Sequence, residues 1–491
     1  MPVRVKVTGT RSGIRDAHPR MPFRFGVVTL RAAPILTLAV EVEAEDGRRA
    51  TGYAADFLAF RWFDKRPERS LADNCADLLR TVEVAAGLYS DAAATGGCQT
   101  PFRLWRETYP EIEATALAEG FNRLGAGFGS SMLERGVIDA VGRLTGRSFA
   151  ELVRRDALGI DLGETFAELR GYELDQFLPA EPLRRLHLRH TVGLVDPITA
   201  ADRAPDGAVD DGLPETLEEY LAVDGIAYLK IKVAGDLEAD LDRLGAIAAV
   251  MARFEGDRRF RVTLDGNEQY GALDGFLALI EGLKSRPALR ALYESILFIE
   301  QPLERSAAMN PSVKPALERL GRDKPVIIDE ADGWVTAFAE AIPLGYRGTS
   351  HKNCKGVYKS LHNLALAAVH NERRGGRPEL FLSAEDLSNL PVVPLQADLC
   401  VVALLGIDHV ERNGHHYFRG LGHLTEAEKS DALAHHVDLY EYRDREVFLR
   451  ILDGDIDIAS LQTPGMGFAA LPDMDAMTPP GAWDFAGLGQ E

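Results

Sequence analysis

Acidic side chains close several short apolar runs of the sequence, and their spacing suits a metal site. Asp265 ends "RFRVTLD", Glu300 ends "SILFIE" and Asp329 follows "PVII". In this order they would close three consecutive strands. Carboxylates that meet in one place repel one another, and a hard divalent cation such as Mg²⁺ removes that repulsion. Taken singly, each acid also fits a turn, a strand end or a helix cap; their order and spacing favour the metal.

Lysines flank these acids on both sides in the sequence. "YLKIKVAG" places Lys230 and Lys232 on one face of a strand, and Lys352 lies in "SHKNCKG". A solvated edge strand would explain the first pair alone, because lysine is rarely buried unless it is paired. Beside a metal, desolvation and neighbouring positive charges favour a neutral amine that can act as a base. The metal would hold a carboxylate, a lysine would remove the adjacent α-proton, and the cation would stabilise the enolate.

The elements that carry these residues alternate regularly along the chain. Eight short apolar runs are separated by helical stretches: 186–192, 227–233, 259–265, 295–300, 325–330, 345–352, 379–385 and 407–413. This alternation predicts parallel strands, and eight units over roughly 230 residues predict a (β/α)8 barrel with its active site at the carboxyl ends of the strands. A doubly wound open sheet is the alternative, but no GxGxxG or Walker sequence follows any of the runs.

The regions outside the barrel have patterns of their own. Residues 22–60 contain two runs rich in Val, Leu and Thr that meet at Asp46-Gly47, a hairpin signal, and helical spacing follows from about Pro110 to Arg154. We therefore expect an α+β domain at 1–180 and the barrel at 181–425. Residues 426–491 would form a segment that packs back on the first domain. A long acidic loop is expected at 202–214.

Composition narrows the classes of partner. The 491 residues carry a formal net charge of −20, which argues against a nucleic-acid partner. Four scattered cysteines show no CxxC spacing, the N-terminus lacks the apolar core of a signal peptide, and no apolar run is long enough for a membrane span. A cytoplasmic protein with no membrane association is expected.

Five motifs in this order resemble the enolase superfamily, in its mandelate racemase/muconate lactonizing branch: "KIK", "LDGNE", "IEQP", "IIDE" and "SHKNCKG". The resemblance implies a modified TIM barrel with an α+β capping domain that the C-terminal segment completes. It also implies a small-molecule carboxylate substrate and a homo-oligomer. Lys or His bases with Mg²⁺ are known for this superfamily.

Carried over by position, the resemblance implies a role for each site residue. Three acids would bind one Mg²⁺, with Mn²⁺ as an alternative: Asp265, Glu300 and Asp329. Lys232 would be the base on the second strand, and Lys230 would tune it or contact the substrate carboxylate. Lys352 would be the opposing acid/base on the sixth strand.

Further residues are candidates for the surroundings of the metal or for substrate contacts: Asn267, Glu330, Lys355, Glu385, Asp386 and His190. Lys355 also rivals Lys352, because the family usually has Gly-Gly after the sixth-strand lysine and "KNCKGV" has only Gly356. We favour Lys352. No histidine lies in "FLSAEDL" (381–387), so a two-lysine site fits better than a mandelate racemase-like His–Asp pair.

In the capping domain, Arg24, Trp62 and Lys65 are candidates for substrate specificity. The favoured reaction is dehydration of a hydroxy or sugar acid, with racemisation or epimerisation and cycloisomerisation as alternatives. A different class is a metal-binding barrel that has lost catalysis and has a binding or regulatory role. An unrelated divalent-metal barrel, such as an aldose isomerase, would usually include histidine ligands at its strand ends.

Overall fold

The barrel is closed and all of its strands run parallel. The computed structural model describes residues 2–25, 28–203, 209, 211–256 and 258–488. Each of the eight predicted runs contains a strand: β6 (Arg185–Val192), β7 (Tyr228–Lys232), β8 (Arg261–Asp265), β9 (Ile296–Glu300), β10 (Val326–Ile328), β11 (Gly348–His351), β12 (Phe381–Ala384) and β13 (His409–Arg412). They pair in chain order and β13 pairs with β6, which closes the ring. The predicted barrel is confirmed.

Strand register brings the predicted site residues to one end of the barrel. Lys232 lies opposite Asp265 across β7 and β8, and Asp265 lies opposite Glu300 across β8 and β9. Glu300 is in turn opposite Ile327 of β10, so Asp329 follows two residues further along. The charged residues therefore gather at the carboxyl ends of neighbouring strands.

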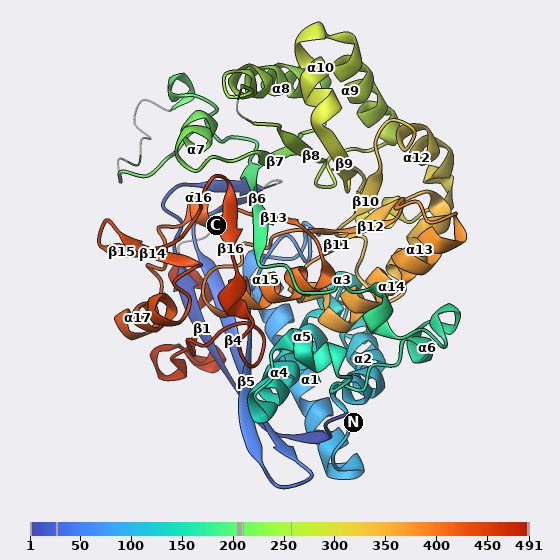
Figure 1. The fold of residues 1–491 in the computed structure, drawn as a ribbon, viewed down its shortest axis with the longest axis vertical. Coiled ribbons are helices and arrows are strands. Elements are labelled where there is room, and N and C mark those ends of the chain that lie inside the picture. Colours follow the sequence, from blue (N-terminus) through green and yellow to red (C-terminus); the bar gives the residue numbers. More distant parts are fainter. Residues whose placement is uncertain (1, 26–27, 204–208, 210, 257, 489–491) are drawn as a thin grey trace.

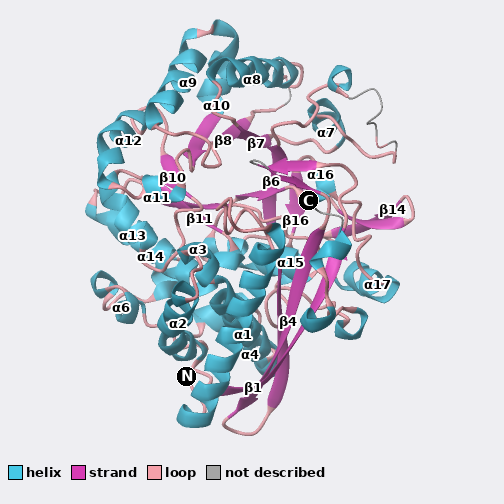
Figure 2. Ribbon diagram, turned by 180° about the vertical axis from the view of Figure 1, so that it is seen from behind, coloured by secondary structure: helices cyan, strands magenta, loops and turns pink. Residues whose placement is uncertain are grey.

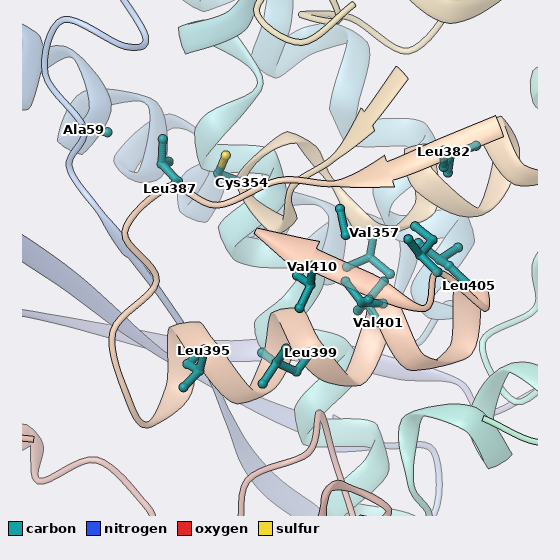
Figure 3. Close-up of a cluster of buried hydrophobic side chains, with 14 of the residues drawn as sticks. Ala59, Cys354, Val357, Leu382, Leu387, Leu395, Leu399, Val401, Leu405 and Val410 are labelled. Atoms are coloured by element: carbon teal, nitrogen blue, oxygen red, sulfur yellow. The ribbon is translucent and has the colours of Figure 1, made fainter. Parts of the chain in front are cut away.

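Helices cover the outside of the barrel, as Figures 1 and 2 show. They are α7 (Leu217–Val223), α8 (Leu237–Ala252), α9 (Leu273–Ser285), α10 (Arg290–Ser295), α11 (Arg305–Ala308), α12 (Lys314–Leu320), α13 (Ala337–Ala341), α14 (Val357–Arg373), α15 (Val393–Leu405) and α16 (Gly414–Tyr417). In α8, Leu241, Leu244 and Met251 are buried at helical spacing, and the Asp236 side chain caps the first turn. Every residue of α15 is buried. Figure 3 shows its side chains packed beside Val410 of β13.

The first domain pairs a small sheet with long helices. The antiparallel strands β1 (Val5–Ala17), β4 (Ala33–Ala44) and β5 (Arg49–Phe57) lie in the order β1-β4-β5, and the predicted Asp46-Gly47 hairpin joins the last two. Gly52 lies so close to the helix α4 (Phe128–Thr145) that a Cβ atom there would be 2.1 Å from the Ala140 nitrogen. The remaining elements are β2 (Phe23–Phe25), β3 (Val28–Leu30), α1 (Leu71–Gly96), α2 (Pro101–Ala118), α3 (Arg123–Ala126), α4 (Phe128–Thr145), α5 (Phe149–Arg154) and α6 (Leu162–Thr165).

Helical structure in this domain begins earlier than the sequence pattern predicts. The side chain of Ser70 caps α1 and Asp73 completes a capping box, so a long helix starts at Leu71 rather than near Pro110. Much of the expected acidic loop at 202–214 lies outside the described residues. None of the helices in the described ranges has both the length and the apolar character that a membrane crossing requires.

The C-terminal segment contacts both the barrel and the first domain. It contains α17 (Glu426–His435), the hairpin of β14 (Tyr440–Arg443) and β15 (Glu446–Leu449), and β16 (Asp455–Asp457), which pairs antiparallel with β6. Further on, Thr478 and Ile14 exchange backbone hydrogen bonds. The domain boundaries at 180 and 425 stay predictions.

Candidate metal and acid–base site

A small cavity of about 50 Å³ lies at the barrel mouth, between the barrel and the first domain. Apolar walls come from the first domain: Phe23, Phe57, Ala59 and Trp62. Charged and polar walls come from the barrel: Lys230, Lys232, Asp265, Asn267, Asp329, Lys352, Asp386, Ser388, Glu411 and Asn413. Two separate parts of the chain therefore enclose the space in which a substrate would meet the charged groups.

Lys230 is the centre of the charge network and is buried, with a side chain 1% exposed. Its Nζ lies 3.1 Å from Asp265 Oδ2 and 2.8 Å from Glu300 Oε2, and it donates to Glu385 at 2.8 Å and to Glu411 at 2.9 Å. Burial opposes its charge, but these four carboxylates outweigh it and raise the pKa of Lys230 well above the usual value. The solvated-edge interpretation of Lys230 is wrong, because the closed barrel leaves β7 no free edge.

Lys232 and Lys352 face the same cavity from opposite sides. Their strands, β7 and β11, are four positions apart in a ring of eight. Lys232 Nζ lies 2.5 Å from Asp265 Oδ2, and Lys352 Nζ lies 2.7 Å from Asp329 Oδ2 and 4.4 Å from the centre of the Trp62 ring. Burial lowers the pKa of Lys352, but Asp329 outweighs it, so the pKa is raised.

The carboxylates at the barrel mouth are the type of oxygen ligand that a hard divalent cation prefers. Burial raises the pKa of Glu300 well above its usual value, and Asp265 and Glu385 raise it further, so the negative charge here is only partly compensated. Lys230 donates to Glu300 Oε1 at 2.9 Å, whereas Glu300 Oε2, 2.8 Å from the same Nζ, accepts no hydrogen bond from any described residue. Oxygen donors with excess charge are what Mg²⁺ takes. Among the described residues no three Asp, Glu, His or Cys side chains are arranged to hold a metal ion, because lysine amines occupy the space between the carboxylates.

Lys355 lies beside the site rather than in the cavity wall. Its Nζ donates to Ser350 Oγ at 2.7 Å and lies 3.3 Å from both Asp329 Oδ1 and Asp332 Oδ2. Of the two rival lysines, Lys352 is the one that lines the cavity.

Two of the other candidate residues line the cavity. Asn267 donates to Glu330 Oε1 at 3.1 Å, and burial raises the pKa of Glu330 to about 7 although Lys65 lowers it. Asp386 also lines the cavity and accepts from Arg412 at 3.0 Å. Burial raises the pKa of Asp386 to about 6.

Glu385 and His190 lie elsewhere. Glu385 is fully buried and does not line the cavity; it pairs with Arg189 and Lys230. His190 does not join the site: its ring packs against Tyr220 of α7, on the outer face of the barrel. The reason is that successive side chains of a strand point to opposite faces. In β6, Arg189 and Thr191 therefore point into the barrel and His190 points outward.

Arg305, which the sequence patterns did not single out, connects the first domain to the barrel mouth together with the specificity candidate Lys65. Arg305 pairs with Glu268 at 2.8 Å and donates to the carbonyl oxygens of Trp62 and Phe63. Lys65 lies 2.5 Å from Glu268 Oε2. Of the specificity candidates, Trp62 and Lys65 thus reach the mouth. Arg24 belongs to β2, and its side chain lies outside the described residues.

Comparisons with known proteins agree on the fold. No family model and no curated protein matches the chain. An enolase from Bradyrhizobium complexed with magnesium and mandelic acid is 17% identical with a TM-score of 0.56, covering 96% of this chain and 97% of its own. A dipeptide epimerase from Enterococcus faecalis complexed with Mg and L-Leu-L-Tyr is 14% identical with a TM-score of 0.57, covering 94% and 99%.

A third solved structure, an enolase from Pseudomonas fluorescens with bound magnesium, potassium and tartrate, is 13% identical with a TM-score of 0.57 and covers 96% of this chain and 91% of its own. At these identities the comparisons show the fold. The chain has the enolase-type fold, with an antiparallel capping sheet on an eight-stranded parallel barrel.

Proposed function

We propose that this protein is a Mg²⁺-dependent enzyme that removes the α-proton of a small carboxylate substrate. The observation that carries the proposal is the placement of Lys232 and Lys352 on opposite sides of one cavity, beside the converging acids. A barrel that only binds metal would not need two amines facing its cavity. The structural neighbours named above contain magnesium together with mandelic acid, a dipeptide or tartrate, all of which carry a carboxylate.

Each residue then has a chemical task. Three acids would hold the cation: Asp265, Glu300 and Asp329. When bound there, Mg²⁺ would hold the substrate carboxylate and stabilise the charge of the enolate. Lys232 or Lys352 in its neutral form takes the α-proton, and the opposite ammonium protonates the enolate or a departing hydroxyl. Lys230 stays protonated among its four carboxylates and orients Asp265 and Glu300.

Dehydration of a hydroxy or sugar acid is the outcome we favour, because a hydroxyl that leaves needs only a nearby proton donor. Racemisation or epimerisation is the second candidate, and the opposed lysines support it directly. One lysine can remove the proton from one face while the other returns a proton to the opposite face. Cycloisomerisation shares the first step and differs in the substrate.

The test is a panel of hydroxy acids, sugar acids, amino-acid derivatives and dipeptides, incubated with the enzyme in D₂O with Mg²⁺. We expect α-deuterium incorporation or loss of water, and a loss of at least about 100-fold in Lys232→Ala or Lys352→Ala, as for general acid–base groups. Lys314→Ala, at an exposed lysine that does not line the cavity, is the control and is expected to retain exchange. If Mg²⁺ binds but no carboxylate exchanges or turns over, a non-catalytic metal-binding barrel is correct. If Mg²⁺ also fails to bind, the whole proposal fails.

A further inference from the structure

A second, larger cavity of about 300 Å³ lies on the outside of the barrel, and it shares no lining residue with the cavity at the mouth. It is bounded by α7, by residues 389–395 after β12, by the turn after β13 and by the β14–β15 hairpin. The eighth strand is followed only by the four-residue helix α16, so no long helix covers this part of the wall. The hairpin of the C-terminal segment covers it instead and leaves the cavity beneath.

Several polar groups at this cavity are buried and have no hydrogen-bond partner among the residues that the structure describes. They are Tyr220 OH, His415 Nδ1 and Asn389 Oδ1, and Tyr220 is only 2% exposed. Leaving a buried polar group unpaired costs about 1–3 kcal/mol, and a ligand that supplies a hydrogen-bond partner removes this cost. A partly apolar cavity with three unpaired polar groups in its wall has the composition of a site for a small ligand.

The charge of the cavity wall indicates the kind of ligand. Glu441 pairs with Arg443 at 3.1 Å. Arg412 forms ion pairs with Asp386 and Asp398. Asp224 differs, because no described residue gives its carboxylate a hydrogen bond or a close ion pair. Burial raises the pKa of Asp224 to about 6, while the more distant Arg443 lowers it. One unpaired negative charge therefore remains at the cavity.

Asp224 and Tyr220 lie four residues apart on α7 and its C-terminal cap, and hence on the same helix face. The Tyr220 hydroxyl interacts electrostatically first with Arg20, whose charge Asp211 offsets at 2.6 Å, and then with Asp224. Around them the wall is apolar, with Leu390, Leu395 and Phe448 among its residues. We propose that this cavity binds a small organic ammonium ion, with its apolar body against these side chains and its N–H groups donating to the Asp224 carboxylate and the Tyr220 hydroxyl.

This ligand site is independent of the chemistry at the barrel mouth. Three small aromatic compounds that differ in charge test it. Benzylamine, benzyl alcohol and benzoate present a cation, a neutral group and an anion on the same ring. Isothermal titration calorimetry with the full chain at pH 7.5 is expected to show that benzylamine binds at least tenfold more tightly than the other two, a difference of about 1.4 kcal/mol.

Asp224→Asn should weaken benzylamine binding at least tenfold, and Tyr220→Phe should weaken it less. Asp224→Asn removes a desolvated charge, so its thermal midpoint should match or exceed that of the parent protein, which separates lost binding from misfolding. Lys232→Ala, at the other cavity, should bind benzylamine unchanged. Equal binding of all three probes, no binding of benzylamine, or unchanged affinity in Asp224→Asn would each overturn the proposal.

Discussion

Lys230 Nζ contacts four carboxylates at the barrel mouth, and this arrangement determines the electrostatics of its neighbours. The acids come from β8, β9, β13 and the end of β12, so one ammonium connects four strands. A lysine so deeply buried is tolerated only because its partners offset the desolvation cost. Lys232 and Lys352 differ, since each has one close carboxylate and each lines the cavity.

Replacing Lys230 should therefore destabilise the protein as well as damage the site. In Lys230→Met four buried carboxylates lose their common partner, and we expect the free energy of unfolding to fall by roughly 3–5 kcal/mol. Urea denaturation measures the change. Lys314→Met is the control: this lysine is half-exposed and 4.0 Å from Glu318, so a change within about 0.5 kcal/mol is expected. A loss as small as that of the control would mean that the four carboxylates are neutral in the folded protein.

At the scale of elements, the segment after β5 closes the barrel mouth. Arg305 at the start of α11 donates to the carbonyl oxygens of Trp62 and Phe63 at 2.9 and 2.8 Å and pairs with Glu268. Lys65 of the same segment also pairs with Glu268. Because the guanidinium contacts carbonyls and a carboxylate at once, it positions the Trp62 ring over Lys352.

Arg305→Lys should loosen this segment without unfolding the barrel. A lysine amine cannot make the forked contacts of a guanidinium, so the amides of residues 57–66 should exchange with deuterium faster while those of α8 stay unchanged. We expect kcat/KM to fall by about tenfold or more, because the cavity wall is displaced. Arg286→Lys, on an exposed part of the barrel, is the matched control. Unchanged amide exchange at 57–66 would show that the segment holds its place without Arg305.

A buried acid joins α4 to the start of α14. Glu134 Oε1 accepts from the Val357 backbone N–H, and its Oε2 is buried with no hydrogen-bond partner in the described part of the chain. Burial raises the pKa of Glu134 from its usual 4.5 to about 8. The folded state therefore favours the protonated acid, and the corresponding stability is present below pH 4.5 and is lost as the pH rises through about 8.

Glu134→Gln should remove this pH dependence, because the amide does not titrate. Between pH 5 and pH 9 the free energy of unfolding of the parent protein should fall relative to that of the variant, by at most about 4 kcal/mol. Urea denaturation across this range measures the difference. Parallel curves for the two proteins would show that Glu134 titrates normally.

Over the whole molecule, one buried aspartate ties together three distant parts of the chain. Asp139 of α4 accepts from the Tyr53 backbone N–H of β5 at 2.9 Å and from the Met466 N–H of the C-terminal segment at 2.8 Å. It also pairs with Arg143 at 2.7 Å. The C-terminal segment is thus part of the folded unit that positions the barrel mouth.

Asp139→Ala leaves two buried N–H groups and a guanidinium unpaired, so we expect a loss of roughly 3–5 kcal/mol in the free energy of unfolding. Limited proteolysis should also cut the segment after residue 458 more readily, since Met466 is released. The exposed Asp475, which pairs with Arg11, gives the control Asp475→Ala with little effect on either measurement. If the two variants were equally stable, the contacts of Asp139 with the C-terminal segment would not contribute to the stability of the fold.

Local sequence patterns were enough to predict all eight barrel strands and the hairpin at Asp46-Gly47, because strand alternation and turn chemistry depend on near neighbours. The acids that end β8 and β9 could be assigned to one end of the barrel for the same reason: parallel strands in a closed barrel bring their carboxyl ends together. The whole of α1 was missed, because the helical stretch was predicted only from about Pro110 and the capping box at Ser70 and Asp73 was not used as a helix signal.

The partners of each charge could not be read from the sequence. Lys230 contacts acids 70, 155 and 181 residues away, and Arg305 contacts Glu268 across 37 residues. Whether His190 faced the cavity or α7 depended on the register of β6 in the closed ring. Such contacts are set when the barrel closes and the first domain and C-terminal segment pack on it, and no short stretch of sequence carries that information.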